Sequence, residues 1–105
     1  MIYLKEDFID DVNEFLALCE QEVEKRKQGI DGEATLEQLT EMIIPEMKEL
    51  LINIEKRLLP TKSKRYLVSF AYAFKVWSWD MRYPTELYMK LNDLDNHYSM
   101  LSVND

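Results

Sequence analysis

The sequence predicts an all-α protein, a compact antiparallel four-helix bundle made by a single domain over residues 1–105. Three observations lead to this prediction. Apolar residues recur at steps of three and four along most of the chain, which places them on one face of a helix. Short connections that hold glycine, proline or capping residues separate these segments. Only two glycines and three prolines occur and 47% of the residues are hydrophobic, which is the composition of a folded chain.

The first predicted helix covers residues 5–28. The bases at 25–27 suit the negative end of the helix dipole, and Gly29 can take the left-handed conformation that ends helices. We therefore expect a loop over residues 29–33. The apolar stripe of this helix consists of Phe8, Ile9, Val12, Phe15, Leu16, Cys19 and Val23.

The second predicted helix begins at Thr35, which has Gln38 three residues later in the pattern of a capping box. Helical spacing of apolar residues continues to Leu58, and Pro60 ends the segment. Pro45 lacks a backbone N–H and its ring clashes with the preceding turn, so we expect a kink or a split near residues 42–44.

Residues 61–81 fit two patterns. Alternation of apolar and small residues over 66–79 is compatible with a buried strand. The same segment also fits a helix, and no second strand-like run is available to pair with a strand. We predict that residues 63–79 form the central and most buried helix, with Ser63 as its cap, and the strand stays the alternative.

The last predicted helix follows a turn at residues 80–84 and is capped by Thr85. Its apolar residues step by four, three, four and three, which makes a narrow seam. The seam consists of Leu87, Leu91, Leu94, Tyr98 and Leu101.

The sequence disfavours a membrane, secretion and an oxidising compartment as the location of the protein. No apolar run approaches the roughly 18 to 20 residues that cross a bilayer, and residues 1–7 lack the basic and apolar regions of a leader. The single cysteine, Cys19, cannot form an internal disulfide, which fits a reducing compartment. We expect a cytoplasmic protein that does not bind a membrane.

Enzymatic function is not expected. His97 is the only histidine, Cys19 lies in an apolar stripe, and no Glu-x-x-His or phosphate-binding loop occurs. We therefore predict no catalytic residue, no metal and no cofactor. The alternative is a small enzyme or metal protein that uses Glu37, Glu41 and His97.

Charge is distributed unevenly along the chain, whose net charge is −7. Residues 1–55 hold 15 acids and five bases, whereas residues 56–105 hold five acids and eight bases. An acidic surface on the first two helices disfavours nucleic acid and favours a basic protein partner through steered association. The bland alternative is a surface that keeps a small domain soluble.

Two further groups of residues are candidate binding sites. The basic residues at 56–57 and 62–65 could hold phosphates, but the spacing of Tyr66, Phe70 and Tyr72 favours a core over a stacking platform, so we expect no nucleic-acid binding. In the cluster Trp77, Trp79, Tyr83 and Tyr88 we expect at least three core residues, and an exposed member would mark a contact site.

The chain resembles bacterial immunity proteins that neutralise nuclease toxins, such as those of contact-dependent growth inhibition and colicin-type systems. The resemblance is one of build over the whole length: a small, acidic, all-helical chain. It includes the segment 64–72, Lys-Arg-Tyr-Leu-Val-Ser-Phe-Ala-Tyr, then Trp77 and the turn 80–84, Asp-Met-Arg-Tyr-Pro. It implies a non-enzymatic inhibitor, one half of a toxin–antitoxin pair, that covers the active site or substrate-binding surface of a basic toxin.

The density of acidic residues suggests where such a toxin would dock. We expect the chain to be a monomer or a weak dimer. The region around Trp77, Trp79 and Tyr83 is the alternative interface. The predicted partner-binding residues are Asp7, Asp10, Asp11 and Glu14 on the first helix and Glu33, Glu37 and Glu41 near the start of the second.

Two other functions use the same features. A phage-derived anti-defence protein or DNA mimic would turn the acidity against a host protein that binds nucleic acid. A helical adaptor would self-associate through the Leu87 to Leu101 seam.

Overall fold

A computed structural model describes residues 4–101, and within that range all regular structure is helical. The all-α prediction is confirmed, and the strand alternative for residues 66–79 is wrong. The elements are helices α1 (Lys5–Lys27), α2 (Leu36–Gln38), α3 (Ile44–Glu55), α4 (Val68–Lys75) and α5 (Glu86–Met100), the π-helical turn η1 (Leu39–Ile43) and the 3₁₀ turn η2 (Lys62–Lys64).

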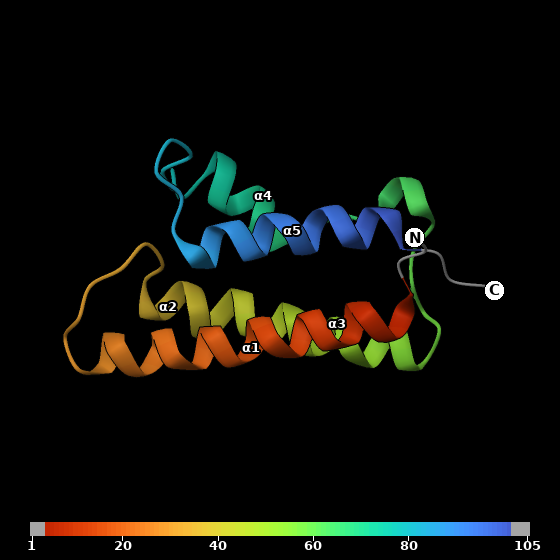
Figure 1. The fold of residues 1–105 in the computed structure, drawn as a ribbon, viewed down its shortest axis with the longest axis horizontal. Coiled ribbons are helices and arrows are strands. Elements are labelled where there is room, and N and C mark those ends of the chain that lie inside the picture. Colours follow the sequence, from red (N-terminus) through yellow and green to blue (C-terminus); the bar gives the residue numbers. More distant parts are fainter. Residues whose placement is uncertain (1–3, 102–105) are drawn as a thin grey trace.

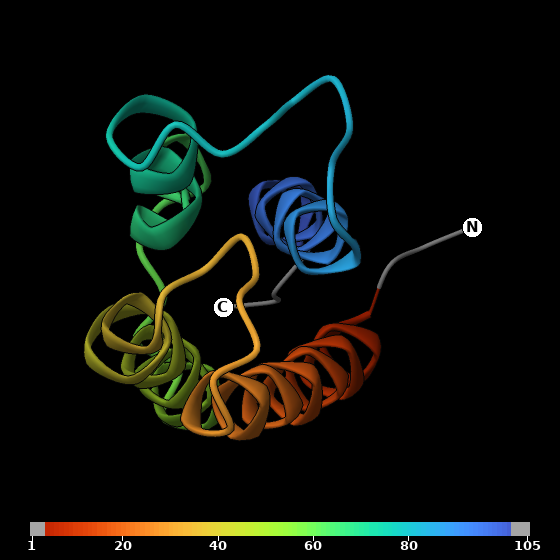
Figure 2. The same ribbon diagram turned by 90° about the vertical axis from the view of Figure 1, so that its left-hand side faces the viewer.

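The helices form two layers (Figures 1 and 2). In the α1–α3 layer, α1 lies antiparallel to a continuous rod made of α2, η1 and α3. In the α4–α5 layer, α5 lies over α1 and runs antiparallel to it, while the short α4 stands beside α5. The arrangement differs from a regular four-helix bundle, because α4 has only eight residues.

The core lies between the two layers and uses the predicted stripes. The α5 seam is buried completely, so it is not available for the self-association that the adaptor hypothesis requires. Its Tyr98 stacks on Phe8 of α1, with 5.6 Å between ring centroids. The buried side chains include Phe8, Val12, Phe15, Cys19 and Val23 of α1, Met47, Leu50 and Ile54 of α3, and Leu87, Tyr88, Leu91, Leu94 and Tyr98 of α5, followed by Leu101.

The loop after α1 is held by one arginine. Gly29 has φ +83°, as predicted for the residue that closes the helix. The side chain of Arg26 is only 7% exposed and donates hydrogen bonds to the carbonyl oxygens of Ala34 (2.6 Å) and Ile30 (3.4 Å) and to Glu22 Oε1 (2.8 Å). These bonds fix the loop against the last two turns of α1.

The second helical segment changes from α-helix to a π-helical turn at the place where Pro45 predicts a kink or a split. The capping box of Thr35 and Gln38 is present, with both hydrogen bonds at 3.0 Å. The N–H of Ile44 then donates to the carbonyl of Leu39, five residues back, which is a π-helical bond. This wider turn accommodates the missing donor and the bulky ring of Pro45, so the helix continues into α3 without a break.

The prediction of a central, most buried helix over residues 63–79 is wrong. Only Val68–Lys75 forms α4, whose buried side chains are Ser69 and Ala73. Tyr66 and Tyr72, predicted for the core, are exposed, and Phe70 is half-buried. Ser63 lies in η2 and not at the start of α4.

Side chains distant in the sequence determine where α4 begins. Glu46 of α3 accepts the N–H groups of Val68 (2.6 Å) and Ser69 (2.9 Å), and Asp95 of α5 accepts the N–H of Leu67 (2.8 Å). These carboxylates satisfy the free N–H groups of the first helical turn and complement its positive dipole end. The start of α4 is therefore a tertiary feature.

Candidate protein-binding surface

The charge asymmetry of the sequence becomes an asymmetry between the layers. The acid-rich residues 4–55 form the α1–α3 layer (Figure 1). The α4–α5 layer, residues 68–101, holds four acids and three bases, and most of the bases beyond residue 55 lie in the connection at 56–65. A field from 15 carboxylates and five cations is therefore concentrated on one side of the core.

The ion pairs of the lysines and arginines within residues 4–101 do not join the two layers. Among the described residues, every ion pair that involves a lysine or an arginine lies within α1. Glu22 takes part in two of these pairs, with Lys25 at 3.1 Å and Arg26 at 2.8 Å, and Glu24 lies 3.7 Å from Lys27.

A line of acidic residues runs along the solvent side of α1. Glu6, Asp10, Glu20 and Glu24 are exposed and are separated by intervals of four, ten and four residues, which places them on one helix face opposite the buried Phe8 and Phe15. We call these four residues the α1 stripe. Only Asp10 of these four is among the residues predicted from charge density. The other three can be predicted from the helical period once the buried face of the helix is known.

The predicted residues near the start of α1 divide between two faces. Asp7 is exposed and accepts the N–H of Leu4 at 3.0 Å, so it caps α1. Asp11 is half-buried against α5, and Glu14 is exposed beside it. Asp10 alone belongs to the α1 stripe.

The predicted residues near the start of the second helical segment lie elsewhere. Glu37 and Glu41 are exposed on α2 and η1, and Glu33 is half-buried and accepts the N–H of Asp80 at 3.1 Å. Figure 1 shows α2 at the end of the molecule where α1 terminates, far from the beginning of α1. The two predicted groups are thus separated along the acidic layer by most of the length of α1, about 1.5 Å per residue.

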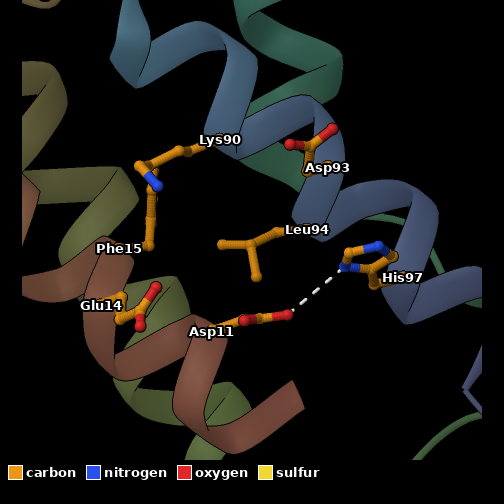
Figure 3. A pocket seen from close by; sticks show the side chains of 7 residues that line it. All are labelled: Asp11, Glu14, Phe15, Lys90, Asp93, Leu94 and His97. Carbon is orange, nitrogen blue, oxygen red and sulfur yellow. Dashed lines mark ion pairs between the residues drawn. The ribbon is translucent and has the colours of Figure 1, made fainter. Parts of the chain in front are cut away.

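A small cleft lies between α1 and α5 (Figure 3). Asp11 Oδ2 and His97 Nδ1 approach to 3.4 Å across it, and Leu94 points toward α1 beside this pair. The cleft also holds Glu14, Phe15, Lys90 and Asp93, so it contains acids and bases but none of the hydroxyl or thiol groups that serve as nucleophiles. Its volume of about 90 Å³ is well below that of a substrate pocket.

The residues of the metal or enzyme alternative are not assembled. His97 lies beside Asp11 near the end of α5, whereas Glu37 and Glu41 lie on α2 and η1. Over residues 4–101 no three histidine, cysteine or acidic side chains are grouped as a metal site would need.

The thiol of Cys19 is buried in the core, as its place in the apolar stripe predicts. Burial raises its pKa to about 12, and the negative charges of Glu22 and Glu20 act in the same direction. The thiol is therefore protonated at neutral pH, whereas a nucleophilic cysteine needs its thiolate.

The aromatic cluster is mainly internal. Trp79 and Tyr88 are buried and meet edge to face at 5.6 Å, and Trp77 packs against the core beside Trp79. Tyr83 is 82% exposed on the connection between α4 and α5. As expected from the sequence, three members belong to the core or its margin and one is presented to solvent.

Arg65, in the basic cluster, has a structural role. Its guanidinium donates to the carbonyl oxygens of Pro60 (2.9 Å) and Leu101 (2.6 Å), which joins the connection after α3 to the end of α5. No sequence pattern indicates this role or those of Glu46 and Asp95, because their partners lie up to 36 residues away.

Comparisons of the chain with known protein families, with functionally characterised proteins and with solved structures found no match. None of the helices within residues 4–101 combines the length and the apolar character that crossing a bilayer requires.

Proposed function

We propose that this chain is a cytoplasmic, non-enzymatic immunity protein that binds a cognate nuclease toxin and neutralises it. The α1–α3 layer covers the basic substrate-binding surface of the toxin. The α1 stripe makes the central contact, and Glu37 and Glu41 extend the contact toward α2 and η1.

The observation that carries this proposal is the one-sided distribution of negative charge, with 15 acids and five bases in residues 1–55. Four exposed carboxylates follow α1. In the part of the chain that the structure describes, the one ion pair that they make with a lysine or an arginine is the exposed pair of Glu24 with Lys27 of the same helix. Such a surface steers a positively charged partner toward it and raises the association rate, most strongly at low ionic strength.

Neutralisation by occlusion requires area and charge rather than chemistry. A nuclease holds its substrate through cations that contact phosphate groups. Carboxylates that occupy the same cations compete with the substrate directly. The support for a binding role over a catalytic one is that the Asp11–His97 cleft is small and that Cys19 is buried as a thiol.

The partner can be identified by affinity purification of the tagged full chain from its native host, followed by mass spectrometry. We expect a protein with a basic nuclease domain, whose activity falls to zero at a stoichiometric amount of this chain. Full nuclease activity in the presence of excess chain would contradict the proposal. A partner that is a host nucleic-acid-binding protein would favour the DNA-mimic alternative.

Two double variants test which surface docks. Asp10→Lys with Glu20→Lys reverses two charges of the α1 stripe and leaves the Asp11–His97 pair intact. Glu49→Lys with Glu55→Lys makes the same change of net charge at exposed positions of α3. We expect the stripe variant to lower the association rate constant at low salt at least about tenfold more than the α3 variant does.

The salt dependence of the association rate provides a second test with the same two double variants. The association rate of the wild-type chain should fall as ionic strength rises, and that of the stripe variant should change less. If the two double variants associate equally fast and with equal salt dependence, the α1 stripe is not the docking surface.

A further inference from the structure

The connection between α3 and α4 carries most of the positive charge of the second half of the chain. Residues 56–79 hold six bases and no acid, although the net charge of the whole chain is −7. Five of these bases lie within residues 56–65. Figure 1 shows this connection, in green, crossing from the end of α3 to η2 at the end of the molecule where α5 finishes. An acidic chain thus has one continuous basic segment, at one end of the molecule.

One arginine holds this connection in a compact turn. Arg65 Nε donates to the carbonyl of Pro60 at 2.9 Å, and the N–H of Lys64 donates to the carbonyl of Thr61 at 2.8 Å. The Nη1 of Arg65 donates to the carbonyl of Leu101 at 2.6 Å, which attaches the turn to the end of α5. The chain itself therefore orders the turn, so a ligand that binds there does not have to supply that ordering.

Three cations of the segment face solvent without a carboxylate partner. Lys56, Arg57 and Lys64 are exposed. Within residues 4–101 none of them forms an ion pair with an acid. Cations that the carboxylates of the fold do not pair with are available to an anionic ligand.

Arg57 adopts a conformation that favours glycine. Its φ is +58°, in the left-handed region where a Cβ atom costs stability. The end of α3 needs a left-handed residue at this position, but it does not need an arginine, because the guanidinium forms no ion pair in the described part of the chain. Backbone strain of this kind is found mainly at sites that bind ligands or switch conformation.

Tyr66 adds an exposed aromatic ring to the segment. It directly follows the turn and is 61% exposed. It lines a pocket together with Asn53 of the last turn of α3, so it lies close to the place where Lys56 and Arg57 follow that helix. The expectation of no nucleic-acid binding assumed that this tyrosine packs in the core, and its exposure removes that assumption.

We propose that the connection over residues 56–66 binds single-stranded nucleic acid. Lys56, Arg57 and Lys64 contact phosphate groups, and a base stacks on the ring of Tyr66. Proteins that bind single strands without reading their sequence combine these two elements, cations along the backbone and aromatic rings under the bases. This site lies outside the α1 stripe and does not rest on the proposed immunity function.

The position of the acids favours a flexible strand over an anionic membrane. Figure 1 shows that α1 begins at the same end of the molecule as the connection. A flat bilayer that met the cations would therefore also approach the exposed Glu6 and Asp7, whereas a single strand can contact the connection alone.

Two exposed acids of α3 lie close enough to weaken the binding. Glu55 precedes Lys56 in the chain, and Glu49 lines the same pocket as Tyr66. Both repel phosphate groups, so we expect weak binding that is strongest at low salt. Glu55→Gln removes one of the two charges and should strengthen the binding.

Fluorescence anisotropy of a labelled strand of about 12 thymidylates, titrated with the full chain, tests the proposal. We expect saturable binding with a dissociation constant below about 1 mM in about 0.05 M NaCl. Each phosphate contact on a single strand contributes about −0.7 to the slope of log K against the logarithm of the salt concentration, so three cations predict a slope of about −2. Absence of saturable binding up to about 1 mM chain would overturn the proposal. Tighter binding to vesicles of phosphatidylserine and phosphatidylcholine than to the strand would do the same and would identify a membrane site.

Matched charge variants locate the cations. Arg57→Gly with Lys64→Gln removes two cations of the segment, and glycine suits the backbone conformation of residue 57. Lys48→Gln with Arg82→Gln makes the same change of net charge at exposed positions outside the segment. We expect the first double variant to weaken binding at least about tenfold and to reduce the salt slope by about 1.4. The second should leave the dissociation constant within about threefold of the wild-type value.

A second pair of variants tests the stacking. Tyr66→Ala removes the exposed ring, and Tyr83→Ala removes a ring that is 82% exposed on another connection. We expect Tyr66→Ala to weaken binding at least about fivefold without changing the salt slope, because stacking releases no counterions, and Tyr83→Ala to stay within about twofold of the wild type. Circular dichroism establishes that each variant is folded. A folded Tyr66→Ala or Arg57→Gly, Lys64→Gln variant that binds the strand as the wild type does would overturn the proposal.

Discussion

Two helix ends are closed by the same hydrogen bonds around different residues. After α1, the N–H groups of Gly29 and Ile30 donate to the carbonyls of Arg26 and Lys25. After α3, the N–H groups of Arg57 and Leu58 donate to Ile54 and Asn53 in the same pattern, the Schellman motif. The motif needs a left-handed residue, which is Gly29 at φ +83° in one case and Arg57 at φ +58° in the other.

The side chain of Arg57 makes this second closure costly, because a Cβ atom disfavours the left-handed conformation. We expect Arg57→Gly to raise the free energy of unfolding by about 0.5–1 kcal/mol, measured by urea denaturation. Gly29→Ala should lower the free energy of unfolding by about 1 kcal/mol. The cause is the positive φ of residue 29 and not a clash, since no atom lies within 4 Å of the added Cβ. A destabilised Arg57→Gly variant would show that the arginine side chain contributes more than its backbone conformation costs.

Glu22 and Arg26 form the most buried ion pair of α1. Burial by itself would raise the pKa of Glu22, but hydrogen bonds from Lys25 and Arg26 and the positive charges of both lower it on balance. Gly32 packs against the guanidinium of Arg26, so closely that an added Cβ would displace it. The Glu22–Arg26 pair therefore helps to hold the loop after α1 in place.

The lowered pKa of Glu22 predicts an acid-sensitive contribution to stability. Because the folded-state pKa lies below the ordinary value of 4.5, the contribution is complete above that value and is lost as pH falls through the folded pKa. We expect Glu22→Gln to cost about 1–2 kcal/mol at pH 7 and progressively less toward pH 3, in urea titrations at each pH.

The control for Glu22 is Glu24→Gln. The Glu24–Lys27 pair is 3.7 Å long and both side chains are more than half exposed, so its loss should cost less than about 0.5 kcal/mol at any pH. If the Glu22 variant lost the same stability at pH 3 as at pH 7, the charge of Glu22 would not be the source of its contribution.

At the scale of elements, α4 depends on its neighbours for its existence. An eight-residue helix is not stable alone, and this one buries few large side chains. Its first N–H groups are satisfied by the carboxylate of Glu46 from α3. The helix is therefore coupled to α3 through one side chain.

Removing that carboxylate should destabilise α4 selectively. We expect Glu46→Ala to lower amide protection throughout α4, by about 1–3 kcal/mol in hydrogen exchange, because two N–H groups lose their acceptor. Protection of α1 should change much less. Glu49→Ala, at an exposed position of the same helix, should leave α4 unchanged. Equal loss of protection in α1 and α4 would mean that Glu46 supports the whole fold rather than one helix.

At the scale of the whole molecule, the acidic layer is a source of self-repulsion. Fifteen carboxylates and five bases share residues 1–55, and the net charge of the chain is −7. Repulsion of this kind destabilises the compact state and is screened by salt. A surface that costs stability in this way is consistent with a surface kept for binding.

This repulsion should be measurable in the chain alone. We expect the free energy of unfolding to rise by up to about 1 kcal/mol between about 0.01 and 0.3 M NaCl. The variant Asp10→Lys with Glu20→Lys should be more stable than the wild type at low salt and should respond less to salt. A wild-type chain that salt destabilises over this range would mean that favourable ion pairs outweigh the repulsion.

The sequence alone determined the elements that depend on local interactions. The stripes of α1 and α5, the caps at Thr35 and Thr85, and the closure at Gly29 all involve residues three to five positions apart, and each is found where the pattern predicts it. The π-helical turn before Pro45 is local for the same reason. The uneven charge is likewise a property of the sequence.

The tertiary structure decided what depends on distant partners. The start of α4 follows from Glu46 and Asp95, which lie 22 and 28 residues from the N–H groups they accept, so no local pattern could locate it. The predicted acidic residues separate into two groups because α1 runs antiparallel to the rod that contains α2 (Figure 1). Tyr72 and Phe74 of α4 are exposed although the segment fits an apolar helix, because packing against the other helices decides which faces are covered.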